Sequence, residues 1–195
     1  MNQLDTNHED IFENFIFCLE GVPDIEESHS SEVVESLEKL AFNYGLASIY
    51  KTCDTIEGLE ESLNTLLYDD HGFKDYEIIY LVMKGEENSI CLNDYYYTLD
   101  EIAEVFEGKL TGKILHFANS KVLDLSSDEA QFFLDVTGAK AISGYGTPFD
   151  RLTSINLDKA FFSFFKETDN VFDIVEELFQ KNYDLCKLLD FRLYY

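Results

Sequence analysis

Two segments decide the fold of this chain: Tyr76-Glu-Ile-Ile-Tyr-Leu-Val-Met-Lys84 and Lys113-Ile-Leu-His-Phe-Ala-Asn-Ser120. Both are apolar nearly throughout, which is typical of strands that are buried on both faces of a parallel sheet. Both end abruptly in polar residues, Lys84-Gly85-Glu86 and Asn119-Ser120-Lys121. Open α/β sheets place their ligand and active sites at the carboxyl ends of central strands. These two strand ends are therefore the first place to look for a functional site.

The rest of the chain alternates between strand and helix patterns around these two segments. Further strands are predicted at 15–20, 46–51 and 139–144, and a small hairpin at 89–97 turns at Asn93-Asp94. Helical spacing of apolar residues is found at 31–45, 56–68, 98–108, 126–138, 152–165 and 171–181. The alternation implies right-handed crossovers and a parallel sheet. Residues 188–195 either add a last strand or pack against the sheet.

We therefore predict an α/β fold, a three-layer α/β/α sandwich with a mainly parallel sheet and a small hairpin. The five predicted strands, numbered along the chain, are expected in the flavodoxin-like order 2-1-3-4-5, with helices on both faces. A chain of 195 residues is most simply one domain. We place this domain at 14–195, after a polar lead-in at 1–13.

The charge of the chain is strongly negative and uneven. The formal net charge is −25, and residues 1–70 carry 17 acidic and 2 basic side chains. Such a surface repels nucleic-acid phosphates, which proteins bind with lysine and arginine. It also disfavours anionic membranes. We expect no nucleic-acid or membrane partner, and the acidic surface serves either solubility or a basic partner.

The four cysteines, Cys18, Cys53, Cys91 and Cys186, lie far apart and form no C-x-x-C pair. We expect reduced, mostly buried thiols that bind no zinc. The chain shows no basic and apolar regions of a secretory signal, and no apolar run reaches the length of a membrane span. These observations favour a cytoplasmic protein.

Common α/β site motifs are absent from the sequence. Gly144-Tyr-Gly146 is a bare G-x-G after a late strand, and no P-loop or G-x-S-x-G elbow occurs. A receiver-type phosphoacceptor needs a carboxylate at the end of the third strand, where Lys84 stands instead. The histidines are widely spaced, and His116, inside an apolar strand, is predicted to be a hydrogen-bonded structural residue. We predict no cofactor and no metal.

The central stretch resembles the caspase-like α/β domains of clan CD cysteine peptidases, especially a bacterial branch related to CHAT-type domains. In that group the third strand ends in His-Gly and the fourth in Ser-Cys or Ala-Cys. The histidine is the general base, the cysteine is the nucleophile, and the amides of the glycine and cysteine form the oxyanion hole. The similarity extends from about Phe15 to Phe165, including Thr137–Tyr145 at the fifth strand.

The resemblance implies which residues of this chain occupy the peptidase positions. Lys84 stands where the histidine is expected, Gly85 keeps the glycine, and Ser120 stands where the cysteine is expected. The resemblance thus implies an oxyanion-like pair of backbone amides at Gly85 and Ser120, with both catalytic side chains replaced. Lys84 and Ser120 are expected side by side at the ends of adjacent strands.

Three functions follow from these positions. The first is a pseudopeptidase, a non-catalytic binding or regulatory module with one or more protein partners. The second is a hydrolase in which Lys84 activates Ser120, which requires a neutral amine in an apolar pocket. Glu86 and Glu87 beside Lys84 favour its protonated form, so we favour the first. The third is an acidic interaction protein with no ancestral site.

Two aromatic runs are candidates for binding surfaces. Phe161-Phe-Ser-Phe-Phe165 places phenylalanines on more than one helical face, which indicates either burial, our preferred interpretation, or a dimer contact. Tyr95-Tyr-Tyr97 alternates along a hairpin strand, so at least one ring is expected to be exposed. The sequence leaves the oligomeric state open, a homodimer included.

Overall fold

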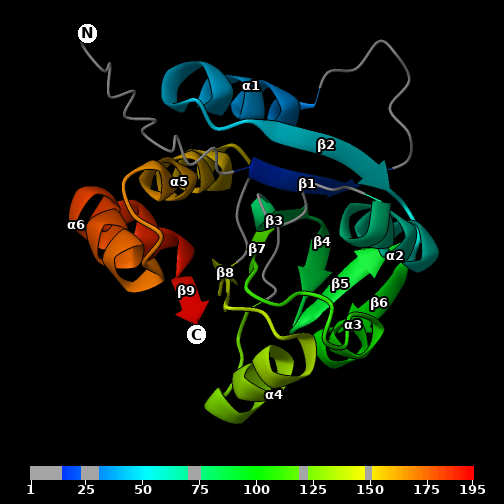
Figure 1. Ribbon diagram of the computed structural model, residues 1–195. Coiled ribbons are helices and arrows are strands. Elements are labelled where there is room, and N and C mark those ends of the chain that lie inside the picture. Colours follow the sequence, from blue (N-terminus) through cyan, green and yellow to red (C-terminus); the bar gives the residue numbers. More distant parts are fainter. Residues whose placement is uncertain (1–14, 23–30, 70–75, 119–122, 148–150) are drawn as a thin grey trace, which may run out of the picture.

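The computed structural model describes residues 15–22, 31–69, 76–118, 123–147 and 151–195. Its main feature is a six-stranded sheet in the order β2-β1-β3-β7-β8-β9, and a three-stranded sheet, β4-β5-β6, stands beside it (Figure 1). The first five strands of the large sheet run parallel, and β9 is antiparallel to β8. The strands of the large sheet are β1 Phe15–Gly21, β2 Ser48–Cys53, β3 Tyr76–Val82, β7 Ile114–Ala118, β8 Ala141–Tyr145 and β9 Phe191–Tyr194.

Helices cover both faces of the large sheet, which makes a three-layer sandwich (Figure 1). One buried cluster joins the sheet to α1, α5 and α6, and a second joins its other face to α2, α3, α4 and β5. Alternate residues of each strand enter alternate clusters: Ile78 and Tyr80 lie in the first, Ile79 and Leu81 in the second. The helices are α1 Glu32–Tyr44, α2 Ile56–Asn64, α3 Leu99–Val105, α4 Ser127–Thr137, α5 Arg151–Ser163 and α6 Val171–Leu189.

Local sequence signals fix several helix ends. Thr98 and Ser126 open α3 and α4 with capping boxes, in which the carboxylates of Glu101 and Glu129 accept a hydrogen bond from the backbone N–H of the cap residue. Gly138 ends α4 with a left-handed φ of 76°. A π-helical turn, Thr65–Asp69, extends α2, and a 3₁₀ turn, Phe164–Lys166, extends α5.

The small sheet consists of β4 Lys84–Glu86, β5 Ser89–Leu92 and β6 Tyr95–Thr98. Its turn residues Asn93 and Asp94 have φ of 49° and 62°, the values of a tight hairpin turn. The predicted hairpin is therefore confirmed, and β4 adds a third strand to it. As expected, rings are exposed on β6: Tyr95 is 69% and Tyr96 55% exposed.

The predicted α/β class, the parallel sheet and the strand order are confirmed, since β7 and β8 are the predicted fourth and fifth strands. Several predicted bounds are wrong. The second strand lies at Ser48–Cys53 instead of 46–51, and the third ends at Val82 instead of Lys84. The last helix runs eight residues beyond the predicted Lys181, across a non-helical Asn182, and residues after it form β9. The predicted lead-in, 1–13, lies outside the described residues.

The G-x-G of β8 serves packing. A Cβ on Gly144 would lie 2.7 Å from the carbonyl oxygen of Phe117 and 2.9 Å from Leu123. A Cβ on Gly146 would collide with the side chains of Asp190 and Arg192. Both glycines are therefore explained by close neighbours within the protein.

Candidate functional site

The ends of the two central strands meet as predicted, up to the limit of the described residues. Val82 pairs with Ala118, and the amide of Met83 donates to the carbonyl of Ala118 at 3.3 Å. Lys84 does not end the third strand but opens β4, where it pairs with Cys91, and it is exposed. This lysine therefore lacks the apolar pocket that a neutral catalytic amine requires.

The other half of the predicted pair lies outside the described residues. Ser120 falls in 119–122, so the expected approach of Lys84 and Ser120 stays a prediction. Gly85 lies in the middle of β4, opposite Ile90, and is half-buried. The predicted oxyanion-like pair of amides depends on Ser120 and is likewise untested.

A second group of polar side chains, which we call the Asp158 network, lies in the core between the sheet and α5. His116 joins Ser143 through Nδ1 at 2.9 Å and Asp158 through Nε2 at 2.8 Å. The hydroxyls of Tyr80 and Tyr145 both donate to the carboxylate of Asp158, the former at 2.6 Å. Each of these five side chains is at most 2% exposed. The prediction that His116 is a hydrogen-bonded structural histidine is confirmed.

The order Ser143, His116, Asp158 matches the connectivity of a serine-hydrolase triad, but the surroundings do not. Phe161 (tilted) and Phe162 (edge-on) contact the imidazole with ring centroids 5.3 Å away, and Phe191 stacks on it at 6.3 Å. Burial, and next the Asp158 carboxylate, raise the pKa of Tyr80 and of Tyr145 well above 10.0. The network joins β3, β7, β8 and α5, and all five of its side chains are buried.

Of the residues in this network, only His116 was predicted from the sequence. Asp158 is the residue whose sequence position could have indicated the network. It lies three and four residues before Phe161 and Phe162, on the same helical face. A carboxylate on an apolar stripe needs buried donors, and tyrosines on the central strands supply them. The prediction that Phe161, Phe162, Phe164 and Phe165 are buried is confirmed.

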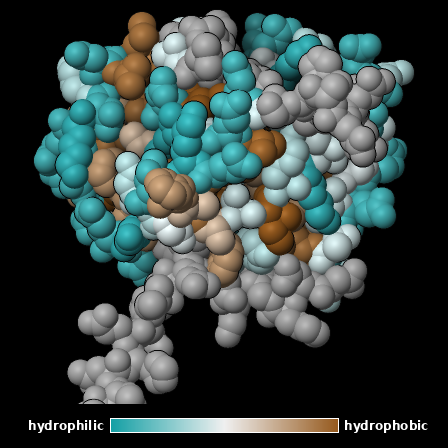
Figure 2. Space-filling model, turned by 90° about the horizontal axis from the view of Figure 1, so that it is seen from above, coloured by the Kyte–Doolittle hydropathy of each residue, from teal (hydrophilic) through white to brown (hydrophobic). Residues whose placement is uncertain are grey.

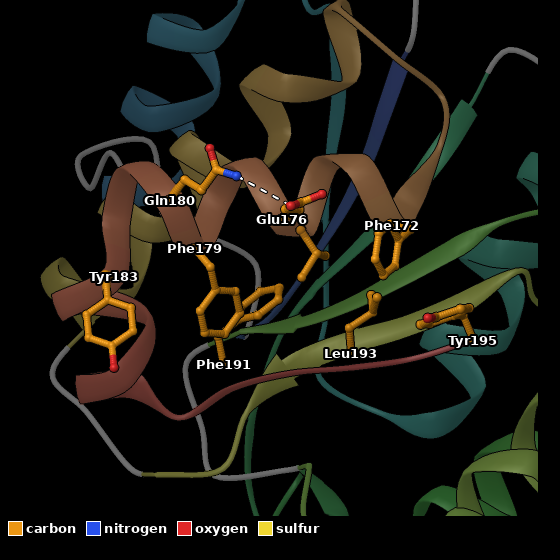
Figure 3. A pocket seen from close by; sticks show the side chains of 9 residues that line it. Phe172, Glu176, Phe179, Gln180, Tyr183, Phe191, Leu193 and Tyr195 are labelled. Carbon is orange, nitrogen blue, oxygen red and sulfur yellow. Dashed lines mark hydrogen bonds between the residues drawn. The ribbon is translucent and has the colours of Figure 1, made fainter.

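The third region is an open groove between α6 and β9, with a volume of about 850 Å³ (Figure 3). In this view Phe172 and Phe179 of α6 point toward the residues of β9 across the groove, whereas Gln180 points away from them. The groove is predominantly apolar, and Glu176 is the single charged side chain in its lining. The lining residues are Phe172, Val175, Glu176, Phe179, Gln180 and Tyr183 of α6, and Phe191, Leu193 and Tyr195 of the last strand and its end.

Helix α6 has two apolar stripes, and only one of them is fully buried in the core. Ile174, Leu178 and Leu189 are completely buried against the sheet. The neighbouring stripe includes Phe172, which is 57% exposed, and Tyr183, which is 55% exposed. This second stripe faces the groove rather than another helix (Figure 3).

Among the described residues, β9 is an edge strand of the large sheet, and we call this edge the border. The amide of Gly146 donates to the carbonyl of Asp190 at 2.9 Å, and the same register pairs Gly144 with Arg192 and Ile142 with Tyr194. Antiparallel ladders alternate bonded and non-bonded pairs. The backbone N–H and C=O of Phe191 and Leu193 therefore point away from β8, to the open side of the sheet.

The charges near this border are mainly negative. Arg192 is held by the carboxylates of Asp190, at 2.7 Å, and Asp124, which raise the pKa of its guanidinium. Helix α4, which contacts β9 from the other face of the sheet, contains Asp128, Glu129 and Asp135 but no lysine or arginine. The surface beside this border is therefore predominantly acidic.

The four cysteines are free thiols, and burial raises the pKa of Cys53 and of Cys186 to about 11 each. Within the described ranges, no group of three or more histidine, cysteine, aspartate or glutamate side chains could hold a metal ion. None of the helices in the described part of the chain combines the length and apolarity needed to cross a bilayer.

Fold and groove together define a three-layer α/β protein whose parallel sheet ends in an antiparallel border strand beneath a helix. A model of a family of unknown function, DUF6642, matches residues 13–195, and the chain belongs to this family. No curated protein matches the chain.

Proposed function

We propose that this protein is a non-catalytic binding module that recruits another protein through the groove between α6 and β9. The observation that carries the proposal is the coincidence, in one place, of an open apolar groove and a strand with outward-facing backbone groups. An exposed apolar surface of this kind is typical of protein–protein interaction sites. The groove is open along its length, which suits an extended segment better than a small molecule that must be largely enclosed.

Two observations support the absence of catalysis in this proposal. Lys84 is exposed, whereas a serine–lysine hydrolase needs its lysine in an apolar pocket. The Ser143–His116–Asp158 arrangement has the right order of groups but is sealed by aromatic rings. In this proposal the fold is caspase-like, and Lys84, Gly85 and Ser120 are the remnants of its peptidase site.

The hydrolase alternative is tested by labelling with a fluorophosphonate at neutral pH. We expect no labelling of the wild-type protein, and Ser120→Ala should leave partner binding unchanged. Stoichiometric labelling of Ser120 that Lys84→Ala abolishes would replace the binding module with a serine–lysine hydrolase.

The binding proposal is tested with a phage-displayed library of random peptides, selected in parallel on two proteins. We expect related apolar sequences to be enriched on the wild type and lost on Phe172→Glu, which places a charge in the groove. Phe42→Glu is the matched control, because Phe42 is 91% exposed on α1 and lies outside the groove. No enrichment, or equal enrichment on Phe172→Glu, would contradict the proposed function.

A further inference from the structure

We infer that the occupant of the groove is an extended segment of a basic partner protein, which adds to β9 as a seventh strand and alternates apolar with lysine or arginine side chains. This inference rests on the proposed function, and it specifies the class of partner and the way in which it binds. Backbone hydrogen bonds to a sheet border supply affinity, and the alternating side chains supply specificity.

The backbone of β9 is arranged for such an addition. Phe191 and Leu193 each present an N–H and a C=O to the open side, because the register with β8 uses the backbone groups of Arg192 and Tyr194. A strand added here lies about 4.8 Å from β9 and extends the ladder. In the described part of the molecule, no strand pairs with this side of β9.

The two faces of the added strand would meet different surroundings. Phe191, Leu193 and Tyr195 point toward α6, so every second side chain of the added strand enters the apolar groove beneath Phe172 and Phe179 (Figure 3). Side chains of a strand alternate between the faces of the sheet. The apolar residues of the partner should therefore occur at every second position.

The intervening positions face the side of α4, where the charges are acidic. Asp128, Glu129 and Asp135 lie on this helix, and the one arginine that β9 contributes is already bonded to two carboxylates. Lysine or arginine at the intervening positions of the partner would compensate this field.

Charge also distinguishes this occupant from a second copy of the chain. Two copies would bring together molecules with a formal charge of −25 each, whereas a basic segment is attracted. The view from the side of α1 shows a predominantly hydrophilic face with small scattered hydrophobic patches (Figure 2). The basic partner segment is therefore the favoured occupant.

The experiment measures fluorescence anisotropy with synthetic peptides of about nine residues, the usual length range of a strand. The first probe alternates valine with lysine, and the second replaces each lysine with glutamate. Two further probes are versions of the valine–lysine peptide with N-methyl groups on every second amide. One is methylated at the valine amides and the other at the lysine amides, so each probe blocks backbone pairing on one side of the strand.

We expect the valine–lysine probe to bind, and the valine–glutamate probe to bind at least about tenfold more weakly. One of the two N-methylated probes should lose binding and the other should keep it, because successive amides of a strand point in opposite directions. Binding of the first probe should weaken as salt rises from about 50 to about 500 mM.

Variants of the protein test the site itself. Leu193→Pro removes an outward N–H without removing a hydrogen bond to β8. The affinity for the first probe should be about tenfold lower for this variant than for Leu193→Ala, which keeps the N–H. Phe172→Glu, which places a charge in the apolar groove, should strongly weaken binding of the valine–lysine probe, and Phe42→Glu should leave binding of both probes unchanged. Far-ultraviolet circular dichroism and urea unfolding show that each variant is folded.

Three results would overturn the inference. Equal binding of both N-methylated probes would mean that the groove binds peptides without strand addition, and the proposed function would survive. Equal binding of the lysine and glutamate probes would contradict the inference that the partner segment is basic. A dimer in light scattering that Leu193→Pro and Phe172→Glu both dissociate would assign the border strand to a second copy. Failure of the phage selection described above, by contrast, would remove the proposed function itself.

Discussion

Asp158 shows how much of the fold depends on a single buried carboxylate. It accepts hydrogen bonds from Tyr80, Tyr145 and His116, which belong to three neighbouring strands. The network therefore fixes α5 over the centre of the sheet. Such a network is costly when one member is removed, because the remaining donors stay buried without a partner.

We expect Asp158→Ala to lower the free energy of unfolding by about 3–5 kcal/mol, the cost of breaking a buried charged group. Asp158→Asn keeps one acceptor oxygen and should lose less. Asp184→Ala, at an exposed position of α6 away from its first turn, is the control and should change stability by less than about 0.5 kcal/mol. Urea unfolding of the three variants measures the differences. A small loss for Asp158→Ala would show that the network is dispensable.

The same network predicts the behaviour of the protein at alkaline pH. Burial and the Asp158 carboxylate raise the pKa of Tyr80 and Tyr145 above 10.0, so the unfolded chain releases these protons at lower pH than the folded protein. Their contribution to stability is complete below pH 10 and is lost as the pH rises above that value. Each contributes a slope of about 1.4 kcal/mol per pH unit.

Above pH 10, the free energy of unfolding of Tyr145→Phe should therefore fall less steeply with pH than that of the wild type, by about 1.4 kcal/mol per pH unit. Urea unfolding of wild type and variant at several pH values on both sides of 10.0 provides the comparison. Identical slopes would mean that Tyr145 ionises in the folded protein as readily as in the unfolded chain.

Residue patterns revealed that His116 is structural, but they did not reveal its partners. Ser143 and Asp158 are distant in sequence from His116, and only the parallel register of β7 and β8 and the position of α5 bring them together. Local propensity contains no information about such pairs. A polar residue on an apolar stripe is the one sequence signal that points to them.

At the scale of elements, the hairpin of the small sheet was predictable because its turn chemistry is local. Asn and Asp tolerate the left-handed backbone that a two-residue turn requires, and Asn93 and Asp94 both adopt it. The helix starts at Thr98 and Ser126 were predictable for the same reason. Signals of this kind need no tertiary context.

Asp94→Gly should stabilise the protein by about 0.5 kcal/mol, because glycine adopts a φ of 62° without strain. Asp94→Val should destabilise it by about 1 kcal/mol, since a β-branched side chain disfavours this conformation. Asp94→Asn removes the charge and keeps the turn preference, so it separates the two causes. Thermal unfolding ranks the variants, and a valine variant as stable as the wild type would contradict the turn geometry.

The predicted end of the last helix at Lys181 was wrong because apolar periodicity weakens at Asn182. Its backbone is non-helical, with φ −131° and ψ 33°, yet the helix resumes and reaches Leu189. Cys186 and Leu189 are buried, so tertiary packing continues the helix where local sequence does not. The extension leads the chain into β9, so the strand that forms the other side of the groove was not predictable from the periodicity of the helix.

At the scale of the whole molecule, the fold class and strand order followed from the alternation of elements, because parallel crossovers leave few topologies. The sequence did not decide whether residues 188–195 form a strand. The pairing of the antiparallel border strand β9 depends on how α6 returns the chain to β8. The net charge of −25 is a further property of the whole chain. This charge contributes repulsion between copies and destabilises the folded state through self-repulsion.

Added sodium chloride should therefore stabilise the protein. Between about 50 and about 500 mM, screening shortens the range of charge repulsion, and the midpoint of urea unfolding should rise. Sodium sulfate is avoided because it also strengthens burial of apolar groups. A midpoint that falls with sodium chloride would show that ion pairs, rather than repulsion, dominate the surface.

The proposed binding site at β9 is tested most directly by amide hydrogen exchange followed residue by residue with NMR. In the free protein, the amides of Phe191 and Leu193 should exchange fast, while those of Arg192 and Tyr194, which face β8, exchange slowly. Addition of the valine–lysine peptide should slow exchange at Phe191 and Leu193 selectively. Unchanged exchange at these two amides in the presence of bound peptide, or slowing at Lys84 and Gly85 instead, would contradict binding at the border strand.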